Sequence, residues 1–141
     1  MKVFNPRFPK IPIHINANKY KINWSAPGRR SNFETIVKNF LQQYWQNHFV
    51  CEELPIPKSG RLKFDFFNVT EGVAIEVQGK QHDEFIKGYF HKSRSDYLRQ
   101  IKRDYFKEEF CQLNGFPLWK IYPDDLPLTR EFFKVNFDYS F

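Results

Sequence analysis

Hydrophobic residues recur at changing intervals along the chain, and these intervals predict the order of its elements. From Phe33 to Trp45 they return every three or four positions, which predicts an amphipathic helix. Ser31 and Glu34 have the spacing of a capping box, so we expect the helix to begin at Ser31. Residues 49–55 then have the pattern of a short strand.

Two runs that alternate apolar and polar residues predict an antiparallel hairpin. They cover residues 62–67 and 73–78, and Gly72 marks the turn between them. For the apolar residues of both runs to share one face, paired residue numbers must add up to an odd value, and a four-residue loop makes that value 141. Asp65 then stands opposite Glu76, on the face away from the packed aromatic residues.

The second half of the chain predicts a long helix and a final strand. The helix is expected to begin near Ser95 and to end at Asn114 and Gly115. The residues of this helix expected to pack inward are Leu98, Ile101, Tyr105, Phe106, Phe110 and Leu113. Residues 116–122 have the pattern of a buried strand. The aromatic segment 126–141 is expected to pack against the core or against another subunit.

The first 30 residues differ from the rest in charge. No acidic residue precedes Glu34, whereas the segment contains seven cations: Lys2, Arg7, Lys10, Lys19, Lys21, Arg29 and Arg30. A basic extended segment beside a nearly neutral body is expected where a protein follows a phosphate backbone, although a solvated tail is the alternative.

The chain is therefore divided into a basic extended arm (1–30), a core (31–125) and an aromatic tail (126–141). The arm residues expected to contact nucleic acid are Lys19, Lys21, Arg29 and Arg30.

The composition excludes several classes of protein. A length of 141 residues fits one domain. The sequence has no run of about 18 uncharged apolar residues, so we expect no transmembrane helix. Its beginning lacks the apolar stretch of a secretory signal, which favours a cytoplasmic protein. Cys51 and Cys111 are too few for a disulfide framework and lack the paired spacing of a zinc site.

Asp65 and Glu76 are the candidate centre of the chemistry. Mg²⁺ prefers oxygen ligands and often binds one or two carboxylates, which leaves positions for water and substrate phosphate. The alternative is an ordinary solvent-facing strand whose acids pair with Lys63 or Lys80. His82 follows this strand and could act as a general base or orient a water molecule, although an isolated histidine is more often structural.

Three segments, in their order and spacing, resemble the PD-(D/E)XK nuclease superfamily, in particular its branch of very short patch repair endonucleases and EDxHD homing endonucleases of phages. The segments are Phe64-Asp65-Phe66, Ala74-Ile75-Glu76-Val77-Gln78-Gly79-Lys80-Gln81-His82, and Arg103 to Phe116, and with Glu34 they fall within residues 34–122. The resemblance implies an α/β (α+β), restriction-endonuclease-like core. Its order would be helix, strand, strand, strand, helix and strand, with a mixed sheet flanked by helices.

The resemblance also implies the roles of individual residues. The family's leading acid corresponds to Glu34, its metal-binding aspartate to Asp65, the first acid of its paired motif to Glu76, its histidine to His82 and its last acid to Asp104. Gln78 departs from the pattern, because many members have a lysine there that stabilises developing charge. Lys80 or Lys107 would then supply the cation, or the metal would replace it.

These residues imply Mg²⁺-dependent hydrolysis of phosphodiester bonds in double-stranded DNA, with Mn²⁺ able to substitute. Asp65, Glu76 and the Val77 carbonyl would hold the ion, which lowers the pKa of a bound water molecule and neutralises charge in the transition state. Lys80 and Lys107 would contact the scissile phosphate, and the basic arm would add salt-dependent affinity.

Three functions are compatible with this reading. A site-specific homing endonuclease of a phage or mobile element is favoured by the long basic arm before a small core. A junction resolvase or mismatch nickase would share the site but prefer branched or mismatched DNA. The third function is a non-catalytic nucleic-acid-binding protein on a nuclease scaffold. This alternative remains because Gln78 stands where many members of the family have a lysine. Either enzyme would act inside a bacterial or phage-infected cell, and a homodimer would allow both strands to be cut.

Overall fold

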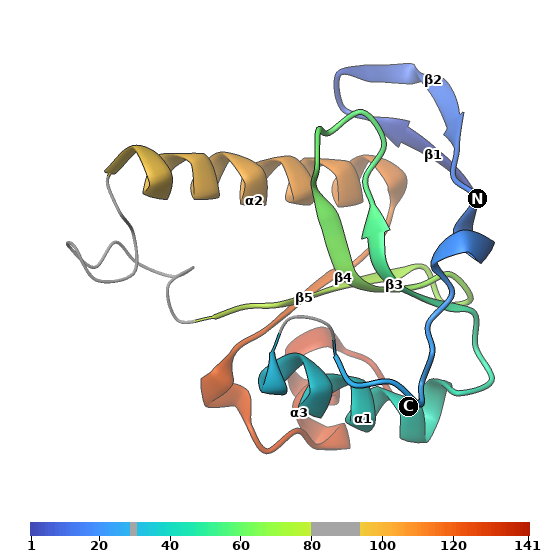
Figure 1. Ribbon diagram of the computed structural model, residues 1–141, viewed down its shortest axis with the longest axis vertical. Helices are drawn as coiled ribbons and strands as arrows, with labels where there is room; N and C mark the ends of the chain where they lie inside the picture. Colours follow the sequence, from blue (N-terminus) through green and yellow to red (C-terminus); the bar gives the residue numbers. More distant parts are fainter. Residues whose placement is uncertain (29–30, 80–93) are drawn as a thin grey trace.

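The computed structural model describes residues 1–28, 31–79 and 94–141 (Figure 1). In chain order, the elements are β1 (Lys2–Asn5), β2 (Phe8–His14), the 3-10 helix η1 (Ala17–Tyr20), α1 (Asn32–Trp45), β3 (Val50–Pro55), β4 (Lys63–Asn68), β5 (Val73–Val77), α2 (Arg94–Asn114), β6 (Leu118–Ile121), the 3-10 helix η3 (Pro123–Asp125) and α3 (Arg130–Phe137). β1 and β2 form a two-stranded sheet, and the larger sheet has the order β3-β4-β5-β6. In the larger sheet only β5 and β6 are parallel, so the protein is mixed α/β with a mixed four-stranded sheet.

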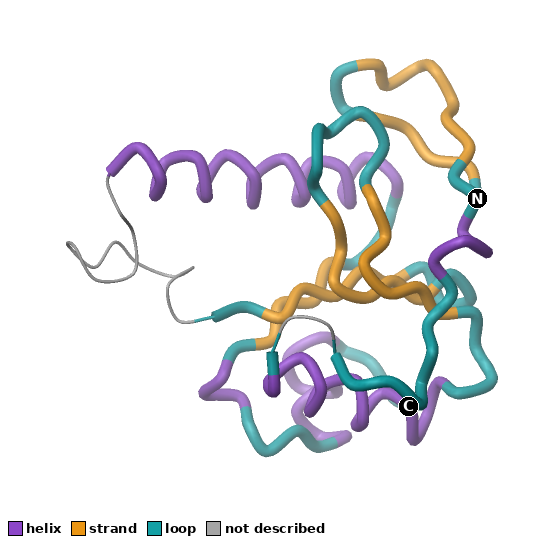
Figure 2. Tube along the Cα trace, viewed as in Figure 1, coloured by secondary structure: helices purple, strands orange, loops and turns teal. Residues whose placement is uncertain are grey.

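Helices cover both faces of the larger sheet. Figures 1 and 2 show α1 and α3 on one side of β5 and α2 on the other. One core cluster joins Val37 of α1 to Ile75 of β5 and Phe133 of α3. A second cluster joins Phe67 of β4 to Phe110 of α2. The sheet is therefore the central layer, and side chains on both of its faces are buried.

α1 begins where the sequence predicts. The Ser31 hydroxyl accepts a hydrogen bond from the Glu34 amide at 3.2 Å, which caps the first turn. Val37, Leu41 and Trp45 form the buried face of the helix. The cap therefore holds the backbone of Glu34 in the first turn of the helix.

The hairpin of β4 and β5 has the predicted register. The paired residues Phe66 and Ile75, Phe67 and Ala74, and Asn68 and Val73 each add up to 141, and Gly72 has a φ of 70° in the turn. The expectation that Phe64 and Phe66 share a face is wrong, because Phe64 packs in the cluster beneath α2 and Phe66 in the cluster beneath α1. The β4–β5 pairing ends at Phe66, and β4 turns away from β5 there (Figure 1). This bend breaks the regular alternation of side chains.

α2 occupies the predicted range but does not pack as predicted. Leu98, Ile101, Tyr105 and Leu113 were expected to face inward and are 45%, 45%, 60% and 41% exposed. Phe110 is buried and Phe106 partly buried in the cluster beneath α2. The N-terminal half of α2 extends beyond the edge of the sheet (Figure 1). Only the C-terminal turns of the helix therefore have a sheet to pack against.

The N-terminal residues fold onto the core instead of extending as an arm. β1 and β2 pair as an antiparallel hairpin, in which Val3 is fully buried. The side chain of Asn114 accepts a hydrogen bond from the Phe4 amide at 2.7 Å and donates one to the Phe4 carbonyl at 2.8 Å. These bonds satisfy both backbone groups of Phe4, so the hairpin is held beside the end of α2.

The aromatic tail packs against α1 and β6. The Thr129 hydroxyl caps α3 by accepting a hydrogen bond from the Phe132 amide at 3.0 Å. Phe133 is fully buried. Its ring is stacked on that of Phe40, with 5.2 Å between the ring centroids, and tilted against that of Trp119, with 5.5 Å between the centroids. α3 therefore completes the core on one side of the sheet.

Phe133→Ala is expected to lower the free energy of unfolding by about 3–5 kcal/mol, because the truncation leaves a cavity in the aromatic cluster. Val135→Ala is the matched control on the same helix, where Val135 is 73% exposed, and it should change this free energy by less than about 0.5 kcal/mol. Urea denaturation followed by tryptophan fluorescence measures both values. Similar losses in the two variants would show that α3 does not contribute to the core.

Candidate active site

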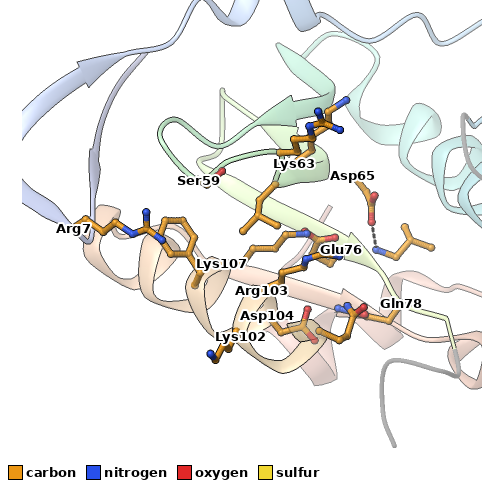
Figure 3. A pocket seen from close by; sticks show the side chains of 15 residues that line it. Arg7, Ser59, Lys63, Asp65, Glu76, Gln78, Lys102, Arg103, Asp104 and Lys107 are labelled. Carbon is orange, nitrogen blue, oxygen red and sulfur yellow. Dashed lines mark hydrogen bonds and ion pairs between the residues drawn. The ribbon is translucent and has the colours of Figure 1, made fainter. Parts of the chain in front are cut away.

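A groove of about 710 Å³ lies between the first residues of β4, the last residues of β5 and one side of α2. Figure 3 shows the side chains that line it. Carboxyl groups from all three elements, those of Asp65, Glu76 and Asp104, lie along the groove. Lysine and arginine side chains contribute much of the remaining lining. The groove therefore combines a few acidic side chains with a larger number of basic ones.

Asp65 takes the place of a backbone partner in the sheet. Its Oδ2 accepts a hydrogen bond from the Val77 amide at 2.7 Å, beyond the last β4–β5 backbone pair. The N–H and C=O groups of one strand residue point to the same side of the strand. The Val77 carbonyl is therefore directed to the side of β5 from which β4 has turned away. A carboxylate and a backbone oxygen, both expected as metal ligands, face one gap.

Glu76 lies beside Asp65 in the protein interior. Asp65 is 3% exposed and Glu76 is 4% exposed, which contradicts the alternative of an ordinary solvent-facing strand. Burial raises the pKa of the Glu76 carboxyl well above its usual range, and the nearby Asp65 carboxylate raises it further. The Lys107 ammonium opposes both effects and donates a hydrogen bond to Glu76 Oε1 at 2.6 Å. The acidic side chains of the two strands thus meet at one point.

α2 brings Asp104 and Lys107 to the same groove. The two residues are three positions apart and line the groove together, as their helical spacing predicts. Figure 3 shows Lys107 beside Glu76, and Asp104 on the same helix. A cation therefore reaches the acidic pair from the helix. Gln78 occupies the strand position at which many members of the superfamily that the sequence resembles have a lysine.

Gln78 has a buried side-chain oxygen that is not satisfied within the described residues. The residue is 5% exposed, and its side-chain oxygen has no hydrogen-bond partner among the described residues. An unsatisfied buried oxygen costs about 1–3 kcal/mol. A hydrogen-bond donor or a cation bound at the end of β5 would remove this cost.

Three carboxyl groups meet on the side of Asp65 that faces α1. Ligand oxygens of Glu34, Glu53 and Asp65 lie within 4.8 Å of one another, and all three residues are buried. Glu34 comes from the first turn of α1, and Glu53 comes from β3. Asp65 therefore belongs both to this group and to the pair with Glu76.

Glu53 is a site residue that the sequence analysis missed. A regular strand directs consecutive side chains to opposite faces, yet Cys51 and Leu54, three positions apart, pack in the same core cluster. Glu53 has a φ of 54°, in the left-handed region, which breaks the alternation of β3. The fully buried Lys38 donates a hydrogen bond to Glu52 at 3.1 Å. The available signal was the pair of adjacent acids in a strand that is otherwise apolar.

Of the cations that the sequence analysis predicted for phosphate contact, Lys107 lines the groove, whereas two others lie elsewhere. Lys19 and Lys21 do not line it, and their ammonium groups lie 5.9 Å from the ring centroid of Tyr20 and 5.7 Å from that of Phe49. Four predicted site residues lie outside the described residues: Arg29, Arg30, Lys80 and His82. The cations that do line the groove are Arg7, Arg61, Lys63, Lys102, Arg103 and Lys107. Their common position was hidden because they come from three distant parts of the chain.

The donor atoms of the site fit a hard divalent cation. Asp65 and Glu76 offer carboxylate oxygens beside the Val77 carbonyl, and Glu34 and Glu53 offer more on the other side of Asp65. Mg²⁺ and Mn²⁺ prefer oxygen ligands of this kind. Closely spaced buried carboxylates also repel one another, and a bound cation relieves that repulsion.

Comparison with known proteins finds two viral relatives. Over 60 residues the chain is 37% identical to the uncharacterized protein 033L of Invertebrate iridescent virus 3, a match that covers 43% of this chain and 30% of that protein. Over 66 residues it is 35% identical to the uncharacterized protein 094L of Frog virus 3 (isolate Goorha), which covers 46% of this chain and 43% of that protein. The chain thus spans less than half the length of these relatives.

No protein-family model matches the chain, and no solved structure matches it. Both relatives come from viruses, and their printed names give no activity. In the described part of the chain, no helix has the length and apolar character needed to span a bilayer.

Both cysteines are expected to be unreactive in the folded protein. Burial raises the pKa of the Cys51 thiol to about 11 and that of the Cys111 thiol, which also lies near the Glu76 carboxylate, to about 12. A raised thiol pKa leaves less thiolate at a given pH, so at pH 8 the thiolate fraction should be ~0.1% or lower. Titration with a thiol-reactive disulfide should therefore label the folded protein very slowly.

The control is the same titration in guanidinium chloride, in which both thiols should react rapidly because unfolding exposes them. Rapid labelling of either cysteine in the folded state would contradict the burial of these two side chains.

Proposed function

We propose that this protein is a metal-dependent DNA endonuclease that hydrolyses phosphodiester bonds, built on a restriction-endonuclease-like core. The observation that carries this proposal is the meeting of the buried Asp65 and Glu76 carboxyl groups at the gap where β4 leaves β5. A pair of this kind, beside a backbone oxygen and a cation, can bind Mg²⁺ and support phosphodiester hydrolysis. The order of α1, β3, β4, β5, α2 and β6 supports the proposed core.

In this proposal, Asp65, Glu76 and the Val77 carbonyl hold the ion, with Mg²⁺ as the expected metal and Mn²⁺ as its substitute. Glu34 and Glu53 support Asp65 from the opposite side or contribute to a second ion. When bound, the metal lowers the pKa of a water molecule and offsets negative charge on the phosphoryl group.

The side chains of the groove have distinct roles around this centre. Lys107 presents an ammonium group beside Glu76, where it can bind a non-bridging oxygen of the scissile phosphate. It therefore replaces the strand lysine for which this chain has Gln78. The Gln78 amide and the Asp104 carboxylate, which both line the groove, can hydrogen-bond a water molecule there. His82 remains the proposed base or water-orienting residue, and Lys80 a proposed phosphate contact.

The substrate is proposed to be double-stranded DNA, and the protein to be a site-specific endonuclease of the homing type. A structure-specific nuclease would use the same centre and differ in preferring branched or mismatched DNA. A non-catalytic nucleic-acid-binding protein is the second candidate, favoured by the Lys107–Glu76 ion pair, because this pair occupies one of the carboxylate oxygens that a metal would use.

Glu76→Gln and Asp65→Asn are each expected to lower the rate of plasmid cleavage with Mg²⁺ by at least about 100-fold, because each removes a charged oxygen ligand of the metal. Both substitutions keep the size of the side chain. Glu131→Gln removes an exposed carboxylate on α3 and should leave the rate unchanged. The assay measures conversion of supercoiled plasmid to nicked and linear forms, with and without Mg²⁺.

Cleavage by the Glu76→Gln protein at the wild-type rate would remove the enzymatic proposal. Tight DNA binding without cleavage by the wild-type protein would favour the non-catalytic candidate.

Lys107→Met is expected to lower the maximal cleavage rate by about 100-fold, because it removes the cation beside the scissile phosphate. Binding of the same DNA in Ca²⁺ should change by less than about threefold, since a single phosphate contact contributes little to a large interface. Single-turnover kinetics and fluorescence anisotropy measure the two quantities. Lys134→Met, on the exposed face of α3, is the control. A Lys107→Met protein with an unchanged rate but weakened binding would assign Lys107 to affinity alone.

A further inference from the structure

Five exposed cations lie along the groove that holds the acidic pair. They are Arg7, Arg61, Lys63, Lys102 and Arg103, and they are called the rim cations below. Arg7 follows β1, Arg61 and Lys63 lie at the start of β4, and the other two belong to α2. Segments that are distant in the sequence therefore place positive charge around a single opening.

Among the described residues, the rim cations have no ion-pair partners, unlike several other cations of the surface. Lys120 pairs with Glu108, and Lys134 pairs with Asp138. Exposed cations that gather without acidic partners raise the local positive potential. Such a potential attracts a polyanion, and the repulsion between the cations is relieved when it binds.

Arg7 is held in place by contacts on both sides. Its guanidinium group lies 5.8 Å from the ring centroid of Phe106 on α2. Its amide donates a hydrogen bond to the Asn5 side chain at 2.8 Å, and Asn5, which is fully buried, donates one to the Pro57 carbonyl at 2.7 Å. The β1–β2 turn is therefore tied to the β3–β4 connection and to α2. Fixing Arg7 before binding reduces the entropy lost when it contacts a phosphate.

The form of the groove favours a duplex over a single strand. Proteins that bind single strands stack the bases on aromatic side chains. Phe106 is the one aromatic residue among the described lining residues, and the Arg7 guanidinium lies over its ring. In Figure 3, Lys63 lies above the acidic pair and Lys102 lies below it. The groove thus offers charge to a backbone and no stacking surface to exposed bases.

We propose that the rim cations bind the phosphate backbone of duplex DNA on either side of the acidic pair, and that they, not Lys19 and Lys21, supply most of the electrostatic affinity. This inference rests on the proposed function, because it places the duplex in the groove of the candidate active site. The β1–β2 hairpin then acts as a fixed wall of the DNA-binding groove instead of an extended arm.

The test is the salt dependence of DNA binding by the full chain without cleavage. Fluorescence anisotropy with a labelled duplex in EDTA gives the association constant across a range of salt concentrations. The triple variant Arg7→Gln, Lys102→Gln, Arg103→Gln should reduce the slope of log K against log salt by about 2–3, since each phosphate contact on B-DNA contributes about 0.9. At about 0.1 M salt its affinity should fall at least tenfold.

The matched control removes three exposed charges elsewhere, with Lys19→Gln, Lys21→Gln and Lys134→Gln, and should leave the slope unchanged. The double variant Lys102→Gln, Arg103→Gln leaves the hairpin intact and should reduce the slope by about 2. This second variant separates loss of phosphate contacts from any loosening of the hairpin at Phe106.

An unchanged slope in the double variant, or an equal reduction in the control, would overturn the inference. Equally tight binding of a single strand of the same length would overturn the choice of a duplex. The result is independent of catalysis. A reduced slope together with no cleavage by the wild-type protein would retain the rim cations as a DNA-binding surface and reject the nuclease. Cleavage by the wild-type protein with an unchanged slope would retain the nuclease and reject the rim cations as its DNA-binding surface.

Discussion

Where β4 turns away from β5, the Asp65 carboxylate accepts the hydrogen bond of the Val77 amide, which a backbone carbonyl of β4 would take in a continuous sheet. This side-chain hydrogen bond satisfies the buried Val77 amide, so the two strands can separate without leaving that amide unpaired. It also holds Asp65 against Glu76 and leaves the Val77 carbonyl directed at the same gap. The groove and its acidic centre both depend on this one bond.

The fold separates opposite charges in a way that suits a phosphodiester. Glu34, Glu53, Asp65 and Glu76 are buried and directed to the centre, where they suit a metal ion. The rim cations are exposed and lie around the opening, where they suit the phosphates. Lys107 stands between these two groups, because it reaches from α2 to the Glu76 carboxylate. A nuclease needs this division, since the metal and the substrate require ligands of opposite sign.

Local patterns predicted the elements from α1 to β6, but they did not predict the β1–β2 hairpin, α3 or how the elements bend. The cap at Ser31 and the turn at Gly72 depend on neighbouring residues, and both are confirmed. The packing of Leu98 on α2 depends on where the sheet ends, which periodicity does not contain. Glu53 was missed because its positive φ is a response to its surroundings. Arg7 and its partners on the rim were missed because tertiary structure alone brings them together.

The most direct test of this account is a crystal structure of the protein grown with Mn²⁺, in which the anomalous signal of the metal is located. The account predicts one strong peak at the gap beside β5, within coordination distance of Asp65, Glu76 and the Val77 carbonyl. Such a peak would require the Lys107 ammonium to leave Glu76 or to share it. A gap without a metal peak, with Lys107 still bonded to Glu76 at a saturating Mn²⁺ concentration, would contradict the account.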